Sequence, residues 1–530
     1  MGPAVMSEQE LKLHVPAASA DAVAEELGRH QAAGLALRAM YFDTPQRELV
    51  QARIALRLRQ EGEDWVQTVK MPGANAISRI ELNHPRPGPV LDLSVYAGSE
   101  VGDALARIRG PLGVCYETDV QRLRCELSVP GGTVEAALDR GVLRAAGLEL
   151  PVCEIEFELL HGRPETIFVI GQDWQQRHAL VLDVRSKAER GDQLALLAAE
   201  LSATRDQKDA QSRVARFWAP RMAAATPLQD TMSPAQAMTH IAGECLEQII
   251  RNAAVLAEVD TAGVYPAGTP EHVHQMRVGM RRLRTAWRLF DGAIEAPAPE
   301  LVDGMRTYFA ALGASRDRDV MADGIAPELA RAGMPAIAQE PAGEPVDAAA
   351  LCRSAALQAW LLALYAWSLE VRPAPAPQLT LPAGDAQTPA IIPLDAAPPR
   401  PSLRPFLLRR LRRWHRQVIE DGRRFGELDL PARHELRKRA KRLRYGLSFA
   451  DSLLPRARLR GYRKQLALLQ DLLGQINDLA VAAEHYRALT ERHPQAWFAL
   501  GWIAARLQAP VARAQPAFDK LARYRGLWRA

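Results

Sequence analysis

The segment "EQELKLHV", Glu8–Val15, alternates charged or polar residues with mostly apolar ones. Because successive side chains of a β-strand point to opposite faces, Glu8, Glu10 and Lys12 share one face of a strand. Six further segments before about residue 200 show the same alternation between Gly and Pro residues: "ARIALRLRQ", "WVQTVKM", "SRIELNH", "TVEAALD", "PVCEIEFELL" and "LVLDVRSKA". The first part of the chain is therefore predicted to form a β-sheet domain.

The predicted strands carry charges of both signs on single faces. Glu154, Glu156 and Glu158 share one face, and Arg57 and Arg59 share another. Further charged positions on predicted strands or their ends are Lys70, Arg79, Glu81, Arg122, Asp139, Arg185 and Lys187. This pattern fits either a sheet face open to water or a closed barrel with a polar interior.

A closed polar interior would need ligands that match its charges. Carboxylates suit Mg²⁺ or Mn²⁺, and Arg and Lys suit phosphate oxygens. An enclosed triphosphate with a divalent metal satisfies both signs, whereas unmatched buried charges would be costly. The chemistry that follows is phosphoryl transfer to water by positioning and electrostatic stabilisation.

After about residue 233 the apolar period becomes helical. "TMSPAQAM" predicts a helix with Ser233 as N-cap and Pro234 in its first turn, so we place a boundary near residues 205–232. The proline-rich stretch from Arg372 to Pro405 predicts a surface linker between two helical halves.

The two helical halves look duplicated. "HQMRVGMRRLR" begins at His274 and "HELRKRAKRLR" at His434, while "LGASRDRDV" begins at Leu312 and "LGQINDLAV" at Leu473. Two matched landmarks at nearly the same offset predict an internal repeat. The halves differ where Arg316 and Asp317 are answered by Asn477 and Asp478, so they need not bind a ligand equally.

Both landmark helices carry a cationic stripe opposite an apolar one. At about 100° per residue, one face gathers His434, Arg437, Lys438, Lys441, Arg442 and Tyr445, and the other gathers Leu436, Ala440, Leu443 and Leu447. In the first repeat, His274, Arg277, Arg281, Thr285 and Arg288 lie across from Met276, Met280, Leu283 and Trp287. A solvated helix normally mixes charge signs, because like charges at i and i+4 repel. We therefore expect an anionic partner, with Arg439 and Arg444 lying off the stripe.

The chemistry of the stripes narrows the class of partner. Duplex DNA readers offer Asn or Gln to bases and single-strand binders offer aromatic rings, and the stripes have little of either. Nucleic acid is therefore disfavoured, although it stays a competing hypothesis. A membrane is also disfavoured, because the apolar stripes are needed for a bundle core. A polymer of bare phosphates fits best.

Composition sets outer limits on these predictions. The net charge of the 530 residues is only +5, so the basic charge must be segregated. The five cysteines have no C-x-x-C spacing, which favours reduced thiols in the cytoplasm. The most apolar run, "AALQAWLLALYAWSL" from Ala355, is shorter than the roughly twenty residues of a membrane span and predicts a buried helix. The N-terminus lacks an export signal, and Met6 is a second candidate start.

These motifs together resemble two known families. "EQELK" matches the E-x-E-x-K signature of the CYTH superfamily, the triphosphate tunnel metalloenzymes. "YFDTPQRELV", "ALRLR", "WVQTVK", "CEIEFEL" and "RSKAERG" follow in that family's order. The helical part resembles the CHAD domain, the conserved-histidine α-helical domain, through the His274 and His434 segments and the two "LG" landmarks.

The resemblance implies a multidomain α+β architecture. Residues 6–205 would form an eight-stranded antiparallel tunnel barrel with helices, followed by a linker at 206–232. Residues 233–525 would form duplicated all-α bundles, with halves at about 233–371 and 403–525 and the proline-rich linker at 372–402.

The resemblance also implies residue roles. The catalytic set would be Glu8, Glu10, Lys12, Arg57, Arg59, Lys70, Arg122 and Lys187. The metal ligands, for Mg²⁺ or Mn²⁺, would be Glu8, Glu10, Glu154 and Glu156, with Glu158 and Asp139 as further ligands or supports of a general base. Polyphosphate would contact His274, Arg277, Arg281, Arg282, Arg284, Arg288, His434, Arg437, Lys438, Lys441, Arg442 and Tyr445.

The function implied is metal-dependent hydrolysis of inorganic triphosphate, or of short-chain polyphosphate, in the barrel, with polyphosphate bound by the helices. Thiamine triphosphate hydrolysis and adenylate cyclisation are alternatives within the superfamily, although no adenine pocket is evident. A third alternative is a non-catalytic protein that binds polyphosphate in the cytoplasm, at polyphosphate granules.

Overall fold

The computed structural model describes residues 6–73, 75, 77–261, 268–320, 324–337, 347–370, 372, 402–524 and 528, with side chains except at 6, 7 and 314–320. These residues divide into two compact units. The first comprises the described residues of Met1–Met222, Glu247–Met276 and Asp347–Leu369, and the second those of Ala223–Leu246, Arg277–Val346 and Glu370–Ala530. Each unit is therefore assembled from separate stretches of sequence.

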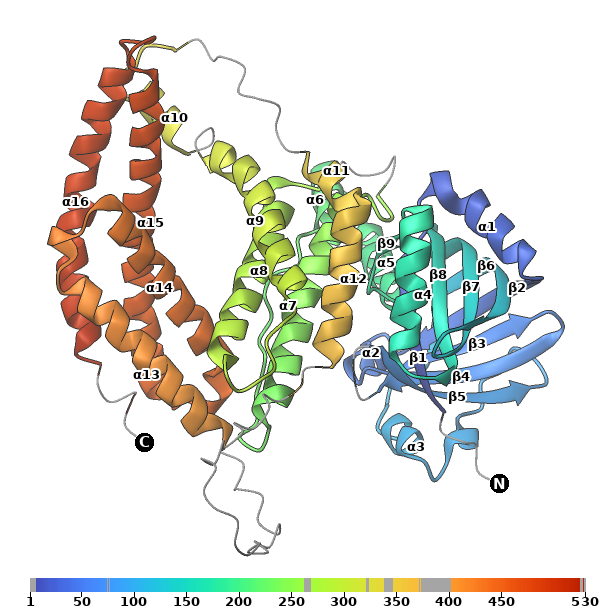
Figure 1. Ribbon diagram of the computed structural model, residues 1–530. Coiled ribbons are helices and arrows are strands. Elements are labelled where there is room, and N and C mark those ends of the chain that lie inside the picture. The colour runs from blue at the N-terminus through green and yellow to red at the C-terminus, as the bar shows by residue number, and fades with distance from the viewer. Residues whose placement is uncertain are drawn as a thin grey trace, which may run out of the picture. The chain divides into compact units, whose positions relative to one another are not determined.

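The first unit is built on a closed antiparallel barrel of eight strands (Figure 1). Its strands are β1 (Met6–His14), β2 (Ala33–Asp43), β3 (Ala55–Glu61), β4 (Asp64–Pro72), β5 (Ser78–Arg86), β6 (Gly113–Val129), β7 (Gly132–Ala145) and β8 (Leu148–Gly162). They are ordered β5-β4-β3-β2-β6-β7-β8-β1, and pairing of β1 with β5 closes the ring. The predicted fold class is confirmed.

Six of the seven quoted alternating segments are strands, and the seventh was predicted wrongly. Only Val181 and Leu182 of "LVLDVRSKA" form a strand, β9. The Ser186 hydroxyl then accepts a hydrogen bond from the amide of Glu189 at 3.1 Å, so helix α5 (Lys187–Ser202) begins at Lys187. The strands β2 and β6 were not among the segments that alternation identified.

Helices cover the outer face of the barrel. α1 (Ala20–Arg29) lies over β6 and β7, and α2 (Glu48–Gln51) and α3 (Glu100–Leu105) lie over β3, β4 and β5. α4 (Glu165–His178) lies over β1 and β8, where Trp174 meets the edge of Phe157 at a ring distance of 5.6 Å. α4 approaches closely because a Cβ on Gly171 would stand 2.4 Å from the Leu11 side chain.

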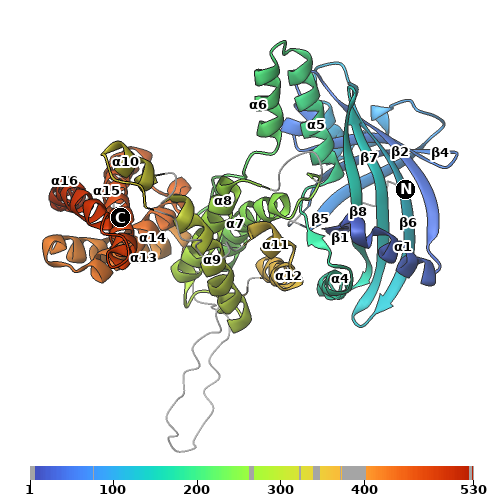
Figure 2. The same cartoon turned by 90° about the horizontal axis from the view of Figure 1, so that it is seen from above.

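The helix α12 (Ala355–Leu369) packs beside α4, as Figure 2 shows. Phe168 and Tyr365 form an edge contact there with ring centroids 5.8 Å apart, and Leu357, Leu361 and Leu364 are fully buried. The prediction of a buried helix is confirmed. Within the described residues, no helix is both long and apolar enough for a membrane span.

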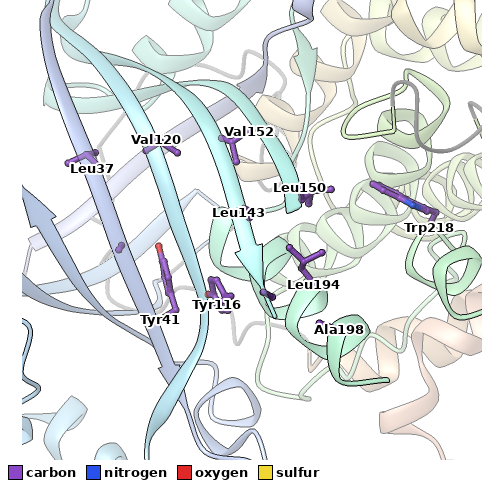
Figure 3. Close-up of a cluster of buried hydrophobic side chains, with 12 residues drawn as sticks. Leu37, Tyr41, Tyr116, Val120, Leu143, Leu150, Val152, Leu194, Ala198 and Trp218 are labelled. Carbon is purple, nitrogen blue, oxygen red and sulfur yellow. The ribbon is translucent and has the colours of Figure 1, made fainter. Parts of the chain in front are cut away.

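An apolar cluster occupies part of the barrel's inward face (Figure 3). Tyr41 and Tyr116 stack with ring centroids 4.6 Å apart, and Leu194 and Ala198 of α5 pack on the same cluster. Gly191 is needed at this contact, because a Cβ there would lie 2.3 Å from the Tyr116 ring. The Tyr116 hydroxyl donates to the carbonyl of Ala188 at 3.0 Å, which fixes the first turn of α5.

The remaining helices are α6 (Gln207–Phe217), α7 (Pro234–Leu256), α8 (Pro270–Phe290), α9 (Pro299–Val320), α10 (Ala326–Arg331), α11 (Ala348–Arg353), α13 (Leu403–Gly422), α14 (Leu430–Phe449), α15 (Arg456–Leu489) and α16 (Ala496–Ala522). The Ser233 hydroxyl accepts from the amide of Gln236 at 3.2 Å, which confirms the predicted start of α7. The first landmark of each repeat falls on α8 or α14, and the second on α9 or α15. Most of the proline-rich linker, residues 373–401, lies outside the described residues, and all five cysteines are free thiols.

Candidate active site and basic helices

The register of the barrel brings the predicted charged residues to one face. Residues directly opposite each other in an antiparallel pair point to the same side. Lys12 lies opposite Glu156, and Asp139 lies opposite Arg122 on one side and Glu154 on the other. Pairs of this kind, followed around the ring, place the strand candidates on the same face: Glu8, Glu10, Lys12, Arg57, Arg59, Lys70, Arg122, Asp139, Glu154, Glu156 and Glu158. Helices cover the other face, so this face is the interior.

Lys187 is the centre of one buried charge cluster. Its Nζ lies 2.7 Å from Asp139 Oδ2 and 2.9 Å from Glu156 Oε1, and it also pairs with Glu154. Carboxylate oxygens of these three residues lie within 4.8 Å of one another, so they would repel strongly without a cation. Burial opposes a charged amine, yet the three carboxylates hold the pKa of Lys187 above its usual range.

Arg122 completes this cluster from β6. Its Nε and Nη2 each donate to Asp139 at 2.7 Å, and Nη2 also donates to Glu156 at 2.9 Å. Burial would raise the pKa of Asp139 and of Glu156, but Lys187 and Arg122 hold both values below the usual range. The cluster therefore holds charges of both signs in fixed positions, with Lys187 and Arg122 as its cations.

A second cluster, around Lys70, has an excess of carboxylates. Lys70 Nζ lies 2.9 Å from Glu8 Oε2 and 2.5 Å from Glu81 Oε2. Burial raises the pKa of Glu8 to about 9, against the opposing charge of Lys70 and with the help of Glu81 and Glu10. Burial also raises the pKa of Glu158. Burial and the neighbouring carboxylates therefore favour the protonated form of Glu8.

Arg57 and Arg59 line the wall between the two clusters. Arg57 donates to the Tyr41 hydroxyl at 3.4 Å and lies 3.7 Å from Glu81. The Arg59 Nε donates to Glu61 at 2.6 Å. Burial, and then the neighbouring charge of Arg57, lower the pKa of Arg59. Each guanidinium thus faces the interior with one carboxylate beside it, Glu81 for Arg57 and Glu61 for Arg59. A guanidinium has further N–H donors, which suit an anionic ligand.

The two clusters fit a divalent metal differently. Hard carboxylate oxygens are the ligands that Mg²⁺ and Mn²⁺ prefer, and Glu8, Glu10 and Glu158 offer them where negative charge exceeds positive. A metal ion can take the place of a proton on Glu8. Asp139, Glu154 and Glu156 are instead compensated by Lys187, Arg122 and Arg190. Metal ligation by Asp139, Glu154 and Glu156 stays a prediction, and it requires Lys187 to move.

The second-repeat stripe is partly exposed on α14. His434 is exposed, and its Nδ1 lies 2.7 Å from Asn477 Oδ1 of α15. Arg437 Nη2 is 3.9 Å from Asp478 Oδ1. The two landmarks of this repeat thus meet in space. In the first repeat, Arg316 and Asp317 take the places of Asn477 and Asp478, and their side chains are not among those described.

Cations from α8 and α14 come close enough to repel one another. Burial lowers the pKa of Lys441 to about 7, and the charges of Arg437, Arg281 and Arg444 lower it further, with Asp478 opposing. Burial and then Arg288 lower the pKa of Arg442 in the same way. Like charges so arranged need an anion to offset them.

The ring of Phe309, on α9, supports three arginines of α8. The guanidinium carbons of Arg277, Arg284 and Arg281 lie 4.6, 5.6 and 6.0 Å from the ring centroid. Cation–π attraction at such distances holds the arginines on one side of the helix. Sequence patterns did not identify Phe309, because an aromatic residue at helical spacing looks like ordinary core.

Two side chains that were predicted to contact polyphosphate, those of Arg282 and Tyr445, are buried. Arg282 is 3% exposed, and it donates to the carbonyl of Ala224 at 3.1 Å and lies over the Phe449 ring. Tyr445 is 8% exposed. Both side chains are packed among neighbouring helices, and their contact with polyphosphate stays a prediction. Thr285, assigned to the stripe of α8, is buried too, and its hydroxyl bonds to the carbonyl of Arg281.

Three interior residues were left out of the predicted site. Glu81 binds Lys70, Tyr41 binds Arg57, and Arg190 pairs with Glu154. Glu81 and Arg190 stand inside quoted motifs, "SRIELNH" and "RSKAERG", so a weaker signal was present. Tyr41 is the first residue of the quoted motif "YFDTPQRELV", but nothing in that motif marks a hydroxyl that meets an arginine.

Comparison with known proteins agrees with this organisation. A curated inorganic triphosphatase of Haemophilus influenzae is 27% identical over 157 residues, which cover 28% of this chain and 44% of that protein. The chain thus spans less than half of the length of this relative.

Two solved structures are similar to separate parts of the chain. The CHAD domain of Ricinus communis is 30% identical with a TM-score of 0.40, covering 57% of this chain and 96% of that one. An adenylyl cyclase candidate of Hippeastrum, for which a dominant triphosphatase activity is described, is 16% identical with a TM-score of 0.28, covering 34% and 93%.

Two family models match adjacent parts of the sequence, one over the barrel and one over most of the helices. The CYTH domain matches residues 6–191 and the CHAD domain matches residues 240–487. The chain therefore belongs to the proteins in which a CYTH domain is followed by a CHAD domain.

Proposed function

We propose that the barrel hydrolyses inorganic triphosphate, or short-chain polyphosphate, with Mg²⁺ or Mn²⁺. The observation that carries this proposal is the interior face, on which six predicted cations and a set of carboxylates converge. Five of the cations lie on strands and the sixth on α5: Lys12, Arg57, Arg59, Lys70, Arg122 and Lys187. The match to the CYTH domain and the likeness to an inorganic triphosphatase support the same activity.

The proposed roles follow from charge balance. Lys187, Arg122 and the two β3 arginines would bind phosphate oxygens and stabilise charge in phosphoryl transfer. Glu8, Glu10 and Glu158 would hold the metal, which when bound would neutralise phosphate charge and help to orient the attacking water. Asp139 is a poor proton acceptor, because Arg122 and Lys187 hold its pKa low. If Glu8 and Glu10 hold the metal without Glu158, then Glu158, whose pKa burial raises, is the better candidate for a general base.

We further propose that the stripes on α8 and α14 bind polyphosphate. The support is a group of cations that lie close together. The positive charges of Arg437 and Arg281 help to lower the pKa of Lys441. These helices offer few groups that read bases. The ligand that fits is a flexible chain of phosphates.

The activity is tested by phosphate release from tripolyphosphate with Mg²⁺ or Mn²⁺ over a range of pH. Glu10→Gln should lower turnover by about 10²- to 10³-fold, the usual loss for a group that acts in the transition state. Glu117→Gln is the matched control, since Glu117 is exposed on β6 and pairs with residues of the outward face. No turnover by the unmodified protein under any of these conditions would leave the non-catalytic hypothesis in its place.

A panel of tripolyphosphate, thiamine triphosphate and ATP separates the substrates. Fastest release from tripolyphosphate is expected, because the cations of the interior face offer contacts to phosphates. Faster cyclisation of ATP or faster hydrolysis of thiamine triphosphate would replace this assignment.

Polyphosphate binding is tested by competition. Labelled polyphosphate should be displaced by unlabelled polymer at lower phosphate concentration than by duplex or single-stranded DNA at the same salt. Equal competition per phosphate would contradict the assignment.

A further inference from the structure

Asp260 has a buried carboxylate in a segment that follows a helix of the CHAD match, and its ion-pair partners Arg185 and Arg190 belong to the barrel part of the chain. It follows α7 and lies within the segment matched by the CHAD domain, yet it belongs to the same compact unit as the barrel. Its side chain is 1% exposed. Its φ of 62° lies in the left-handed region, as does the φ of 68° at Glu258. A sparsely populated backbone conformation persists where the surroundings fix it, and it often marks a functional contact.

The contacts of Asp260 lead directly to the interior cluster. Its Oδ1 and Oδ2 lie 3.2 and 3.3 Å from Arg190 Nη1, and Oδ2 lies 3.3 Å from Arg185 Nη2. Arg190 Nη2 donates to Glu154, the residue that also pairs with Lys187. A continuous chain of ion pairs therefore joins Asp260 to a proposed phosphate-binding cation through two residues.

The two oxygens of Glu154 are divided between two cations. Oε1 receives Lys187 and Oε2 receives Arg190. Arg190 is 2% exposed, so its charge must be balanced inside the protein. With Asp260 present, Arg190 has two acids. Without that charge, Arg190 would have Glu154 as its one direct ion-pair partner, beside the charge of Asp183, and would compete with Lys187 for Glu154.

We propose that Asp260 is a positioning residue for the barrel's phosphate site, acting through Arg190 and Glu154 on Lys187. The inference rests on the proposed function, and it gives the helical part a role in the barrel that needs no bound polymer. Arg190 and Lys187 are three residues apart on α5, so they project from one side of the helix toward Glu154. The barrel residues alone would leave Arg185 and Arg190 without one of their acids.

The test is Asp260→Asn in the full chain, which keeps the shape and removes the charge. We expect KM for tripolyphosphate to rise about tenfold, the lower end of what loss of an outer supporting contact costs, with a smaller fall in kcat. The dissociation constant of tripolyphosphate should also increase about tenfold. It is measured by calorimetry in EDTA, which keeps the protein free of metal. About 300 mM salt in this titration suppresses binding to exposed cations.

Glu258→Gln is the matched control. Glu258 lies two residues away in the same turn, has the same sign of φ, and pairs at 2.7 Å with Arg353 at the surface. It should leave KM and the dissociation constant unchanged. The double variant Asp260→Asn with Arg190→Gln restores the charge balance and removes the competitor for Glu154, so it should fold and return KM toward the unmodified value. If Asp260→Asn does not fold, Asp260→Glu takes its place: it keeps the charge but moves it, and it should raise KM by a smaller factor.

The outcomes separate this inference from the proposed function. A purely structural role would lower the melting temperature and the active fraction but leave KM and the dissociation constant as in the unmodified protein, and that result overturns the inference. Failure of the unmodified protein to release phosphate overturns the triphosphatase proposal instead. In that case weaker metal-free binding by Asp260→Asn would still support the positioning role.

Discussion

The barrel interior and the surface of α8 and α14 are both rich in cations, but they treat charge in opposite ways. In the interior, Lys187 has three carboxylate partners and Arg122 has two. On the helices, the neighbours of Lys441 are mainly cations. Paired charges are held in place before a ligand arrives, which suits a short ligand of fixed size. Charges of one sign gain from any anion, which suits a polymer of variable length.

The largest expected difference is in salt dependence. Between about 50 and 200 mM salt, polyphosphate affinity should fall about 10³-fold if some six cations contact the polymer, as counterion release requires. KM for tripolyphosphate should change by less than about tenfold, because buried charges are screened less. Kd and KM measured over one salt series check this. Equal salt slopes would remove the distinction between the two regions.

The next largest effect is expected from a substitution that removes Lys187, the central cation of the interior. Lys187→Met leaves Asp139, Glu154 and Glu156 with less compensation, and loss of one partner of a buried ion pair costs about 3–5 kcal/mol of unfolding free energy. Turnover of tripolyphosphate should fall by about 10²- to 10³-fold. Chemical denaturation and phosphate release measure the two effects.

Lys208→Met, at an exposed position of α6, is the control for this change and should alter neither quantity. A Lys187→Met protein with full turnover would show that the interior cations do not bind the substrate.

We expect the affinity of the helices for polyphosphate to depend on pH. Lys441 has a pKa of about 7 in the free protein, below its usual 10.5, with Arg437, Arg281, Arg444 and Asp478 around it. A bound polyanion would raise this pKa, so binding takes up a proton and affinity falls by up to about tenfold per pH unit above pH 7. In the free protein, the lowered pKa of Lys441 has the opposite effect on folding: the free energy of unfolding increases with pH. Since the unfolded chain holds this proton up to pH 10.5, stability rises with pH from 7 to 10.5.

Kd at pH 7, 8 and 9 checks the prediction for Lys441. Lys441→Arg should give a flatter curve, because arginine stays charged over this range. An identical pH profile in both proteins would mean that Lys441 does not titrate on binding.

The smallest effect concerns the support beneath the cations. Phe309→Leu keeps an apolar side chain but removes the ring under Arg277, Arg281 and Arg284. At about 0.5–1 kcal/mol for an exposed cation–π contact, polyphosphate affinity should fall about threefold. Titration with polyphosphate measures it, and turnover of tripolyphosphate should stay unchanged. A stronger affinity would mean that the ring holds the arginines away from the polymer.

Sequence patterns predicted the barrel well where alternation was strict. The segments at Glu8–Lys12 and Glu154–Glu158 gave both their strands and the residues that share a face, because a period of two separates two sets of side chains. That this face is the interior follows from the closure of the ring. Lys187 was assigned to a strand end, since the capping role of Ser186 is visible only once the helix is seen.

The predictions were weaker where partners come from distant sequence. A helical wheel puts Tyr445 near the middle of the stripe, and only packing decides that it is buried. The burial of Arg282 was equally invisible, because a cation beside an aromatic ring and a carbonyl looks like any other basic residue in the sequence. Asp260 gave no signal at all, since its partners Arg185 and Arg190 lie 75 and 70 residues away.

The alternating register of the barrel also limits how its strands can change in length. Ile155 and Phe157 are fully buried between the inward carboxylates of β8. Deletion of one residue near the start of this strand would exchange the two sets, so the acids would enter an apolar layer and Ile155 and Phe157 would enter the tunnel. Insertion or deletion of two residues keeps the parity. Descendants of this chain should therefore vary the lengths of the barrel strands by even numbers, unless a bulge such as that at Thr133 and Val134 absorbs the odd residue.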